Sequence, residues 1–407
     1  MRVAVITSES REISNALWYQ LQDADEVVIF GGPSAQEAAL PACHRTLEER
    51  DFGGGLLRRH LVGLGTSLDA YQPELIHVNG ELWSVTVQTL LGRAEPLAVH
   101  GAENVWQRGS LVQRRVRDAL IARAVQRIDG YASWNYAGAQ YVQDRVPDGV
   151  PTLVMPAIVP PPLFPLAVWH RRYDAGASPF KVLCVGSLVA QKGFDCVLRA
   201  IGMSSMSDRY EVVICGTGPE QDALAALAET VSVKCSFLGH VDPAELVSLM
   251  TTSDCLVQPS RTVPGLAEQF GRSVAEAMRV GLPCIVSSSG ELPSVVGNPN
   301  AVFPEGDANA LSARLEKLRM SEEFALELSA TQRCAEGRWS GAEAIHRVHE
   351  FWEAVQATGA ARAQTGSRRK RGWRILGSLA GNRADSARLG IGQKLLQAGP
   401  EGLMDRI

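Results

Sequence analysis

Two glutamates, Glu268 and Glu276, flank the start of a predicted helix. Between them Phe270 and Gly271 mark the turn from loop to helix, and a residue without a Cβ lets a ligand approach the backbone closely. The first N–H groups of a helix have no partner within it and favour an anion such as a pyrophosphate. One carboxylate can then accept hydrogen bonds from sugar hydroxyls and the other from a ribose. The segment predicts a site for a nucleotide that carries a sugar.

A lysine and a glycine turn stand in two further loops. Lys192 follows a predicted strand and precedes Gly193, which makes it a candidate cation for a diphosphate. Gly216 and Gly218 form a Gly-x-Gly turn after the next strand. Alone, this turn is weak evidence, because it lacks the third glycine of a dinucleotide fingerprint. An isolated lysine or pair of glutamates would be interpreted as solvated charge, so the hypothesis depends on the motifs occurring together.

Four motifs within residues 178–300 occur in the order of one enzyme family. Glu268 and Glu276 resemble its Glu, seven residues, Glu motif, and Val185–Gly193 resembles its phosphate loop. The segment Ile214–Glu220 is similar to its G-x-G-P-E turn, and Phe237–Gly239 to its F-x-G strand. The chain thus resembles the retaining GT-B glycosyltransferases of the family-4 type, the glycosyl transferases group 1.

The resemblance implies a retaining, metal-independent, hexosyltransferase-like enzyme that uses a nucleotide-diphosphate sugar and no cofactor. It implies that Glu268 binds the donor sugar rather than acting as a nucleophile. Lys192 and the helix start at Gly271 would stabilise the leaving diphosphate, and Glu276 would hold the ribose. The donor-binding residues that we expect are Gly186, Ser187, Lys192, Gly216, Gln269, Phe270, Gly271 and Glu276.

One position departs from the family pattern. Ser187 stands where the family usually carries arginine, so half of the expected cationic clamp on the diphosphate is missing. Fixed charge on a leaving group is a large part of such catalysis. Either another arginine substitutes, with Arg261 and Arg272 as candidates, or activity is reduced.

The first half resembles the family less closely. His100 ends a predicted strand where a family histidine often reaches the transferred sugar, and Asn104 follows it. We take His100 as a candidate catalytic residue, with a structural role as the alternative, and Asn104 as a possible site residue. Asp23 and Asp25 form a literal D-x-D, but between a helix and a strand they are typical of turn chemistry, so no metal site is predicted.

Short apolar runs alternate with helical patterns, such as the helix predicted over Leu56–Tyr71, along the whole chain, which favours an α/β fold with parallel sheets. The proline-rich segment Val159–Pro165 suits neither a helix nor a central strand and predicts a linker. We therefore predict two doubly wound Rossmann-like domains, and the resemblance implies that they form a GT-B fold, facing across a cleft. The predicted divisions are an acceptor-binding domain at 1–165, a nucleotide-sugar-binding domain at 166–340, a helix at 341–358 that packs back on the first domain, and a basic tail or linker at 359–407.

Two basic segments leave alternatives open. A helix predicted over Ser110–Arg127 carries several arginines, which either face an anionic acceptor or membrane or are solvated opposite an apolar stripe that includes Leu111 and Val116. The run Arg368–Arg371 is either a membrane-surface segment or part of a linker, and we favour the linker because the run is short. The end of the chain resembles stretches found between the modules of larger glycan-building proteins. This resemblance suggests further modules of a longer chain as partners.

The composition excludes several classes of function. A formal net charge of −4 offers no electrostatic footprint for nucleic acid. The eight cysteines form no C-x-x-C pair and lie mostly in apolar runs, as free thiols do in a reducing compartment. No apolar stretch is long enough to span a bilayer, so we expect a cytoplasmic protein with at most peripheral membrane contact.

Two other functions fit the same motifs. Ser187 supports one alternative, a GT-B module that binds a sugar nucleotide or glycan without turnover. The other is an NDP-sugar epimerase on the same fold. The expected partners of a transferase are a nucleotide-sugar donor and a glycan, lipid-linked or other hydroxyl acceptor. The sequence does not identify the base, the sugar, the acceptor or the oligomeric state.

Overall fold

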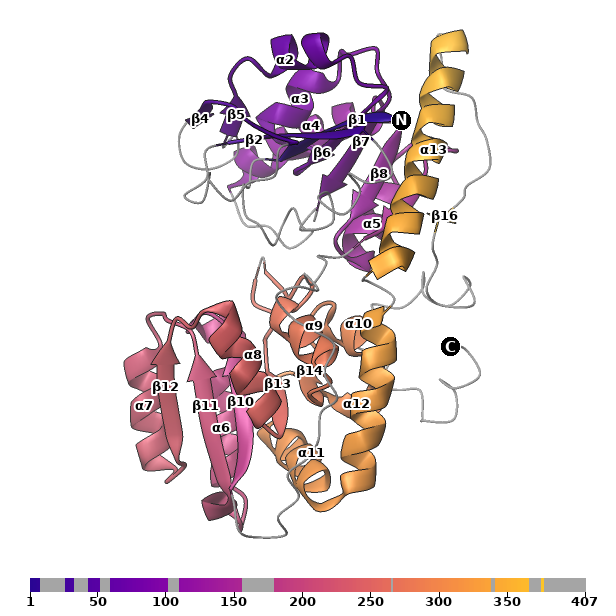
Figure 1. Cartoon of the computed structure of the whole chain (residues 1–407). Coiled ribbons are helices and arrows are strands. Elements are labelled where there is room, and N and C mark those ends of the chain that lie inside the picture. The colour runs from indigo at the N-terminus through magenta and orange to yellow at the C-terminus, as the bar shows by residue number, and fades with distance from the viewer. Residues whose placement is uncertain are drawn as a thin grey trace. The chain divides into compact units, whose positions relative to one another are not determined.

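The computed structural model describes residues 1–7, 26–32, 43–51, 59–101, 110–155, 179–264, 266–337, 341–365 and 375–376. These residues form two compact units, which Figure 1 shows together with their element labels. The first unit comprises the described parts of 1–155 and 341–376, and the second comprises those of 179–337.

The first unit is built on one parallel sheet. Its strands, given in spatial order, are β16 (Ile375–Leu376), β9 (Thr152–Val154), β8 (Gly130–Ser133), β7 (Leu97–Gly101), β6 (Leu75–Asn79), β1 (Arg2–Thr7), β2 (Glu26–Gly31) and β3 (His44–Thr46). The central strands are mostly apolar and buried, the buried His77 and His100 included, because both faces of a parallel sheet are covered. A separate antiparallel pair is formed by β4 (Glu49–Asp51) and β5 (Arg59–Leu61).

Helices cover both faces of this sheet. One face packs on helices that follow the strands: α2 (Leu64–Tyr71), α3 (Val85–Leu90), α4 (Leu111–Val125) and α5 (Tyr136–Gln143). The other face is covered by α13 (Gly341–Thr365), whose Val348, Phe351, Trp352 and Val355 share a core with the strands. Figure 1 shows α13 running beside β8.

Polar anchors also hold α13 on the sheet. The indole Nε1 of Trp352 donates to Nδ1 of His77 at 3.0 Å, inside the core. Arg362 pairs with Asp129 at 2.9 Å and donates to the Arg127 carbonyl oxygen at 2.6 Å. The helix runs seven residues beyond the predicted end at 358, because Ala360 and Ala361 continue it and Arg362 anchors it.

The second unit repeats the parallel architecture with a six-stranded sheet. Its strands, in spatial order, are β12 (Cys235–Gly239), β11 (Tyr210–Cys215), β10 (Phe180–Val185), β13 (Cys255–Gln258), β14 (Cys284–Ser287) and β15 (Val302–Phe303). In chain order this is 3-2-1-4-5-6, the doubly wound Rossmann order. The strand order reverses between β10 and β13, and that switch point is where such sheets bind ligands.

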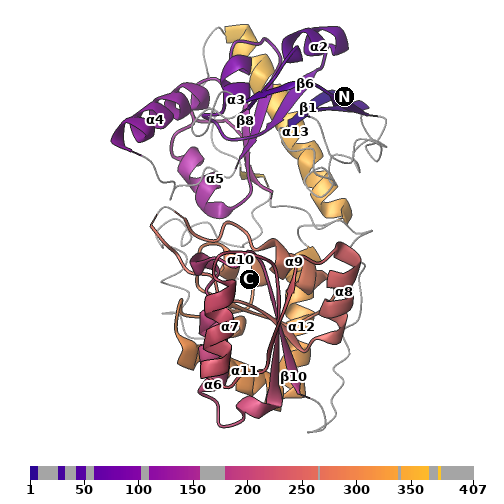
Figure 2. The ribbon, with the colours of Figure 1, turned by 90° about the vertical axis from the view of Figure 1, so that its left-hand side faces the viewer.

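The helices of the second unit lie on both sides of its sheet, as Figure 2 shows from the side. They are α6 (Phe194–Gly202), α7 (Gln221–Thr230), α8 (Pro243–Thr252), α9 (Arg272–Arg279), α10 (Leu292–Val296), α11 (Ala308–Met320) and α12 (Glu322–Gly337). Single 3-10 turns are η3 (Ala190–Lys192), η4 (Ser207–Arg209) and η5 (Pro299–Ala301).

Two expectations from the sequence are wrong. A helix over Leu56–Tyr71 is interrupted, because residues 59–61 form β5 and the helix begins only at Leu64, after a turn at Gly63. In α4, Leu111 and Val116 do not line a buried stripe; they are 68% and 44% exposed, and Ile121, Ala124 and Val125 at the other end of the helix are buried.

The eight cysteines are free thiols, as the sequence predicts. Burial raises the pKa of Cys184, Cys215 and Cys284, so these thiols stay protonated at neutral pH. Among the described helices none is long and apolar enough to cross a membrane.

Candidate functional site

The loop that follows β10 carries the predicted diphosphate lysine. The chain leaves the strand through Gly186 and the exposed Ser187, and Lys192 ends the turn η3. Gly193 then adopts a left-handed conformation with φ 66° and caps α6. A Cβ at Gly193 would lie 2.3 Å from the carbonyl oxygen of Pro259, so this residue must be glycine where the two loops cross.

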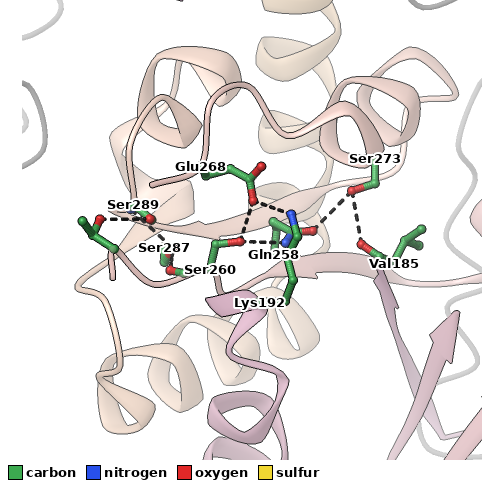
Figure 3. Close-up of polar contacts among 9 residues, drawn as sticks. Val185, Lys192, Gln258, Ser260, Glu268, Ser273, Ser287 and Ser289 are labelled. Carbon is green, nitrogen blue, oxygen red and sulfur yellow. Dashed lines mark hydrogen bonds and ion pairs between the residues drawn. The ribbon is translucent and has the colours of Figure 1, made fainter. Parts of the chain in front are cut away.

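Lys192 and Glu268 meet directly, although they are 76 residues apart in the chain. Nζ of Lys192 lies 2.6 Å from Oε2 of Glu268, as Figure 3 shows. The side chains are 22% and 12% exposed, so both groups can still be reached by a ligand. The structure thus brings together two of the residues that the sequence predicts as catalytic.

A chain of buried side chains fixes the position of the Glu268 carboxylate. The hydroxyl of Ser260 donates to the same Oε2 at 2.7 Å and accepts from Nε2 of Gln258 at 2.8 Å. The hydroxyl of Ser273 donates to Oε1 of Gln258 at 3.2 Å. Gln258 and Ser260 are fully buried. Because Gln258 ends β13 and Ser273 lies in the first turn of α9, this chain ties the carboxylate to the switch point of the sheet (Figure 3).

The helix α9 begins at the predicted place. Gly271 is its N-cap in a left-handed conformation, and the buried Phe270 precedes it. The Ser273 hydroxyl lies 3.4 Å from the Val185 carbonyl oxygen, which places the helix start against the end of β10. Gln269, between the acidic residue and the cap, is partly buried. Main-chain N–H groups at this start can bind an anion beside Lys192.

Glu276 lies one turn inside α9 and is only 6% exposed. Burial raises the pKa of its carboxyl group to about 7, and the Arg272 guanidinium, 3.8 Å away, opposes this shift. Near neutral pH both the protonated and the ionised form of the Glu276 carboxyl group are therefore populated.

The two arginines that could replace the missing cation have different surroundings. Arg261 pairs with Asp195 at 2.8 Å, and this hydrogen bond raises the pKa of its guanidinium. Arg272 is 44% exposed on the first turn of α9. To turn towards a ligand, Arg272 would leave only the 3.8 Å ion pair with Glu276, whereas Arg261 would leave the 2.8 Å pair with Asp195.

The Gly-x-Gly turn after β11 packs on the loop after β10. The N–H of Gly186 donates to the Cys215 carbonyl oxygen at 2.9 Å, and that of Leu188 to the Thr217 carbonyl oxygen at 2.9 Å. A Cβ at Gly216, whose φ is 137°, would lie 1.9 Å from the Gly186 carbonyl oxygen. The requirement for glycine at position 216 is therefore explained by contact between two loops, without a ligand.

His100 is the penultimate residue of β7 in the first unit and is 5% exposed. Nε2 lies 2.9 Å from the carbonyl oxygen of Met155, and the ring packs near those of His77 and Trp134. Burial lowers the pKa of His100 to about 4, so the imidazole is neutral. A carbonyl oxygen can only accept, so Nε2 carries the hydrogen and Nδ1 is the accepting nitrogen.

Asn104, Asp23 and Asp25 lie outside the described residues. No three His, Cys, Asp or Glu side chains gather as metal ligands in the part of the chain that the structure describes.

Sequence reasoning missed Gln258, Ser273 and the role of Ser260. The available signal was a glutamine at the end of an otherwise apolar strand, because a buried amide needs polar partners. Its partners, from a loop and a helix start further along the chain, could be identified only in the folded structure.

Comparison with known proteins finds a family model that matches the second unit. Residues 168–333 match the family model described as glycosyl transferases group 1. Over 141 residues the chain is 28% identical to the GDP-mannose-dependent monoacylated alpha-(1-6)-phosphatidylinositol monomannoside mannosyltransferase of Corynebacterium glutamicum, covering 34% of this chain and 37% of that protein. Over 183 residues it is 31% identical to the D-inositol 3-phosphate glycosyltransferase of Corynebacterium jeikeium, covering 41% and 42%. The matched region thus spans about two fifths of these curated relatives.

Solved structures extend the likeness to both units. The crystal structure of Anabaena HepE in complex with UDP covers 87% of this chain and 100% of its own, with a TM-score of 0.65 and 17% identity. At that identity the match shows the fold alone, and it confirms the predicted pair of doubly wound Rossmann-like domains of the GT-B type.

Proposed function

We propose, from the premise that residues 168–333 form a domain of the group 1 glycosyltransferases, that this chain transfers a sugar from a nucleotide-diphosphate sugar to an acceptor hydroxyl with retention of configuration. The observation that carries this proposal is the meeting of Lys192, Glu268 and the start of α9 at the switch point of the second sheet. A cation, a hydrogen-bonding carboxylate and unpaired N–H groups are what a sugar diphosphate requires.

Different residues act on the different parts of the donor: its diphosphate, its sugar and its ribose. Lys192 and the N–H groups at the start of α9 stabilise the negative charge that develops on the leaving diphosphate. Glu268 binds hydroxyls of the transferred sugar, and Glu276 binds the ribose. The acceptor hydroxyl attacks from the face that the nucleotide leaves, which retains the configuration at the sugar carbon.

The pairing of Lys192 with Glu268 supports hydrogen bonding rather than nucleophilic attack by the carboxylate. Its Oε2 already accepts from both Lys192 and Ser260, and such bonds lower the nucleophilicity of a carboxylate while fixing its direction. On donor binding, Lys192 turns from Glu268 to the phosphate, and the freed oxygen accepts a sugar hydroxyl.

His100 is proposed as the contribution of the first unit. Its place near the end of β7, where the family pattern carries a histidine that reaches the transferred sugar, and its neutral ring support this role. The proposal predicts that His100→Ala lowers turnover more than it weakens nucleotide binding.

The names of the relatives suggest which donors to test first. One matched protein is a GDP-mannose-dependent mannosyltransferase that acts on a phosphatidylinositol mannoside, another is an inositol phosphate glycosyltransferase, and a structural neighbour binds UDP. We infer a hexose donor, with GDP-mannose and UDP-glucose as first candidates, and an acceptor used in building glycans or glycoconjugates.

The experiment is a turnover assay with GDP- and UDP-sugars and an acceptor-rich lipid and glycan extract. Release of nucleoside diphosphate together with a new glycoside of unchanged anomeric configuration is the expected result, and it should persist in EDTA because Lys192 and α9 supply the positive charge. A complete loss in EDTA that a divalent metal restores would contradict the metal-independent assignment.

Ser187 favours one alternative, a module that binds without turnover. Tight nucleotide binding with neither transfer nor hydrolysis for any donor would support that module. Conversion of the donor into its epimer would instead support an epimerase on the same fold.

A further inference from the structure

The first half of α4 presents apolar side chains to solvent on an ordered helix. Leu111 is 68% exposed, Val112 70% and Val116 44%. The helix start is fixed by a capping box, in which Ser110 and Gln113 exchange side-chain and main-chain hydrogen bonds at 2.9 and 3.3 Å. These apolar groups therefore belong to a formed helix whose outer surface is uncovered.

The exposed apolar groups follow one stripe along the helix. Val112, Val116, Ala119 and Arg123 succeed one another at spacings of four, three and four residues, so they share one side. Ile121, Ala124 and Val125 are buried in the core of the first unit, on the opposite side. We call the stripe, with its neighbours Leu111 and Arg115, the outer face of α4.

The helix as a whole is positively charged, and two of its arginines, Arg115 and Arg123, lie on the outer face. The helix contains four arginines, Arg114, Arg115, Arg117 and Arg123, against the single aspartate Asp118, which gives it a net charge of +3 in a chain whose formal net charge is −4. Arg114, Arg115 and Arg123 are exposed. Positive charge is therefore concentrated on the helix that exposes apolar side chains.

We propose that the outer face of α4 docks on an anionic phospholipid surface. A helix that combines exposed apolar side chains with arginines has the composition of an interfacial helix, whose apolar groups enter the boundary region while its guanidinium groups contact lipid phosphates. Charge complementarity selects this occupant, because a purely apolar protein partner would leave the arginines desolvated without counter-charges.

The position of α4 gives the docking a role in acceptor delivery. The helix α4 follows β7 in the chain, so its start lies near the carboxyl ends of the parallel strands. His100 lies near the carboxyl end of β7, at the same edge of the sheet. A membrane held by α4 would present its headgroups near that edge. This consequence rests on the proposed transferase function, and it makes a lipid-anchored hydroxyl the acceptor class.

Co-sedimentation of the full chain with vesicles tests the docking. Vesicles of phosphatidylcholine with phosphatidylserine should bind the chain at low salt, vesicles of phosphatidylcholine alone should bind it much less, and high salt should release it. Arg115→Gln with Arg123→Gln should lower the partition coefficient about tenfold, since each arginine contributes near an anionic surface. Val112→Ser with Val116→Ser should also lower it at low salt, because the apolar side chains that enter the boundary region are lost.

Matched controls remove similar groups from the second unit. Arg199→Gln with Arg209→Gln removes two arginines that are 58% and 50% exposed, and Met203→Ser with Leu326→Ser removes apolar side chains that are 53% and 48% exposed. Both control variants should bind vesicles like the wild type. Neutralising Arg368–Arg371 should also leave most of the binding intact.

Several outcomes would overturn the proposal. They are absence of vesicle binding by the wild type, equal binding by the α4 variants, binding that only the Arg368–Arg371 variant loses, or a concentration-dependent dimer that the α4 variants abolish. Donor hydrolysis without lipid acceptor should be unchanged in the α4 variants. A chain that binds vesicles but turns over no donor would contradict the proposed function and leave the docking standing.

Discussion

Glu276 illustrates how one buried carboxyl group links donor binding to pH. Its pKa of about 7 arises because burial penalises the ionised form, and Arg272 at 3.8 Å compensates only in part. Ribose hydroxyls would donate to the ionised carboxylate, so nucleotide binding should tighten as the pH rises through 7 and should release a proton.

The same group makes the folded state sensitive to pH. The folded pKa of Glu276 lies above its usual value of 4.5, so between these pH values the folded chain binds more protons than the unfolded chain. The free energy of unfolding should therefore fall as pH rises from about 4.5 to 7, by roughly 3 kcal/mol from this residue. Glu276→Gln should flatten that slope in urea unfolding measured across the range. A slope equal to that of the wild type would argue against the buried ionisation.

The two glutamates should respond differently to substitution. Glu268→Gln keeps the shape of the side chain but removes its charge from Lys192 and Ser260, so turnover should fall about 100-fold with nucleotide affinity within a few-fold of wild type. Glu276→Gln should weaken nucleotide binding about tenfold, since a hydrogen bond to a charged group is lost. Calorimetric titration measures the nucleotide affinity of each variant, and initial rates measure its turnover. The site assignment fails if both variants keep wild-type affinity and turnover.

At the scale of elements, the crossing of the loops after β10 and β13 is a tightly constrained local feature. Gly193→Ala should destabilise the chain by about 1–3 kcal/mol, because its φ of 66° is left-handed and a Cβ would meet the Pro259 carbonyl oxygen. The control is Gly65→Ala in α2, where nothing lies within 4 Å of the added methyl group; it should be neutral or slightly stabilising. Thermal melts of the two variants provide the comparison, and equal melting temperatures would contradict the account.

The alternation of strands and helices could be predicted because a parallel sheet covered on both faces needs continuous apolar strands. The start of α9 was predictable as well, since Gly271 before an amphipathic pattern is a local signal. The outer face of α4 was not, because an apolar stripe at helical spacing is the same in sequence whether it faces a core or solvent. The short strand β5 was missed, because its three residues are fewer than a periodic pattern requires.

Long-range polar contacts mark the limit of what the sequence predicts. The pairing of Lys192 with Glu268 agrees with a motif-based site, but their direct contact depends on how two loops cross. The Gln258 to Ser260 chain and the pair of Trp352 with His77 join residues whose spacing carries no signal.

At the scale of the whole molecule, α13, the last of the described helices, belongs to the first unit, so the fold of that unit depends on segments far apart in the chain. Asp129 is 1% exposed and its charge is balanced by Arg362. Arg362→Met should therefore lower the free energy of unfolding by about 3–5 kcal/mol, since the buried carboxylate would lose the guanidinium that pairs with it. Arg347→Met on the same helix, away from Asp129, is the control. If both variants unfolded at the same urea concentration, the proposed stabilisation by the Arg362–Asp129 ion pair would be refuted.

The central claim is that Lys192 and Glu268 form the site of sugar transfer from a nucleotide-diphosphate donor. The most direct test follows nucleoside diphosphate release and product configuration for the wild type, Lys192→Met and Lys234→Met with the donor panel described above. Lys234, 67% exposed and paired with Glu211, is the matched control. We predict a retained glycoside from the wild type and Lys234→Met, and turnover at least 100-fold lower for Lys192→Met. Equal turnover by the two lysine variants, or a product of inverted configuration, would contradict the account.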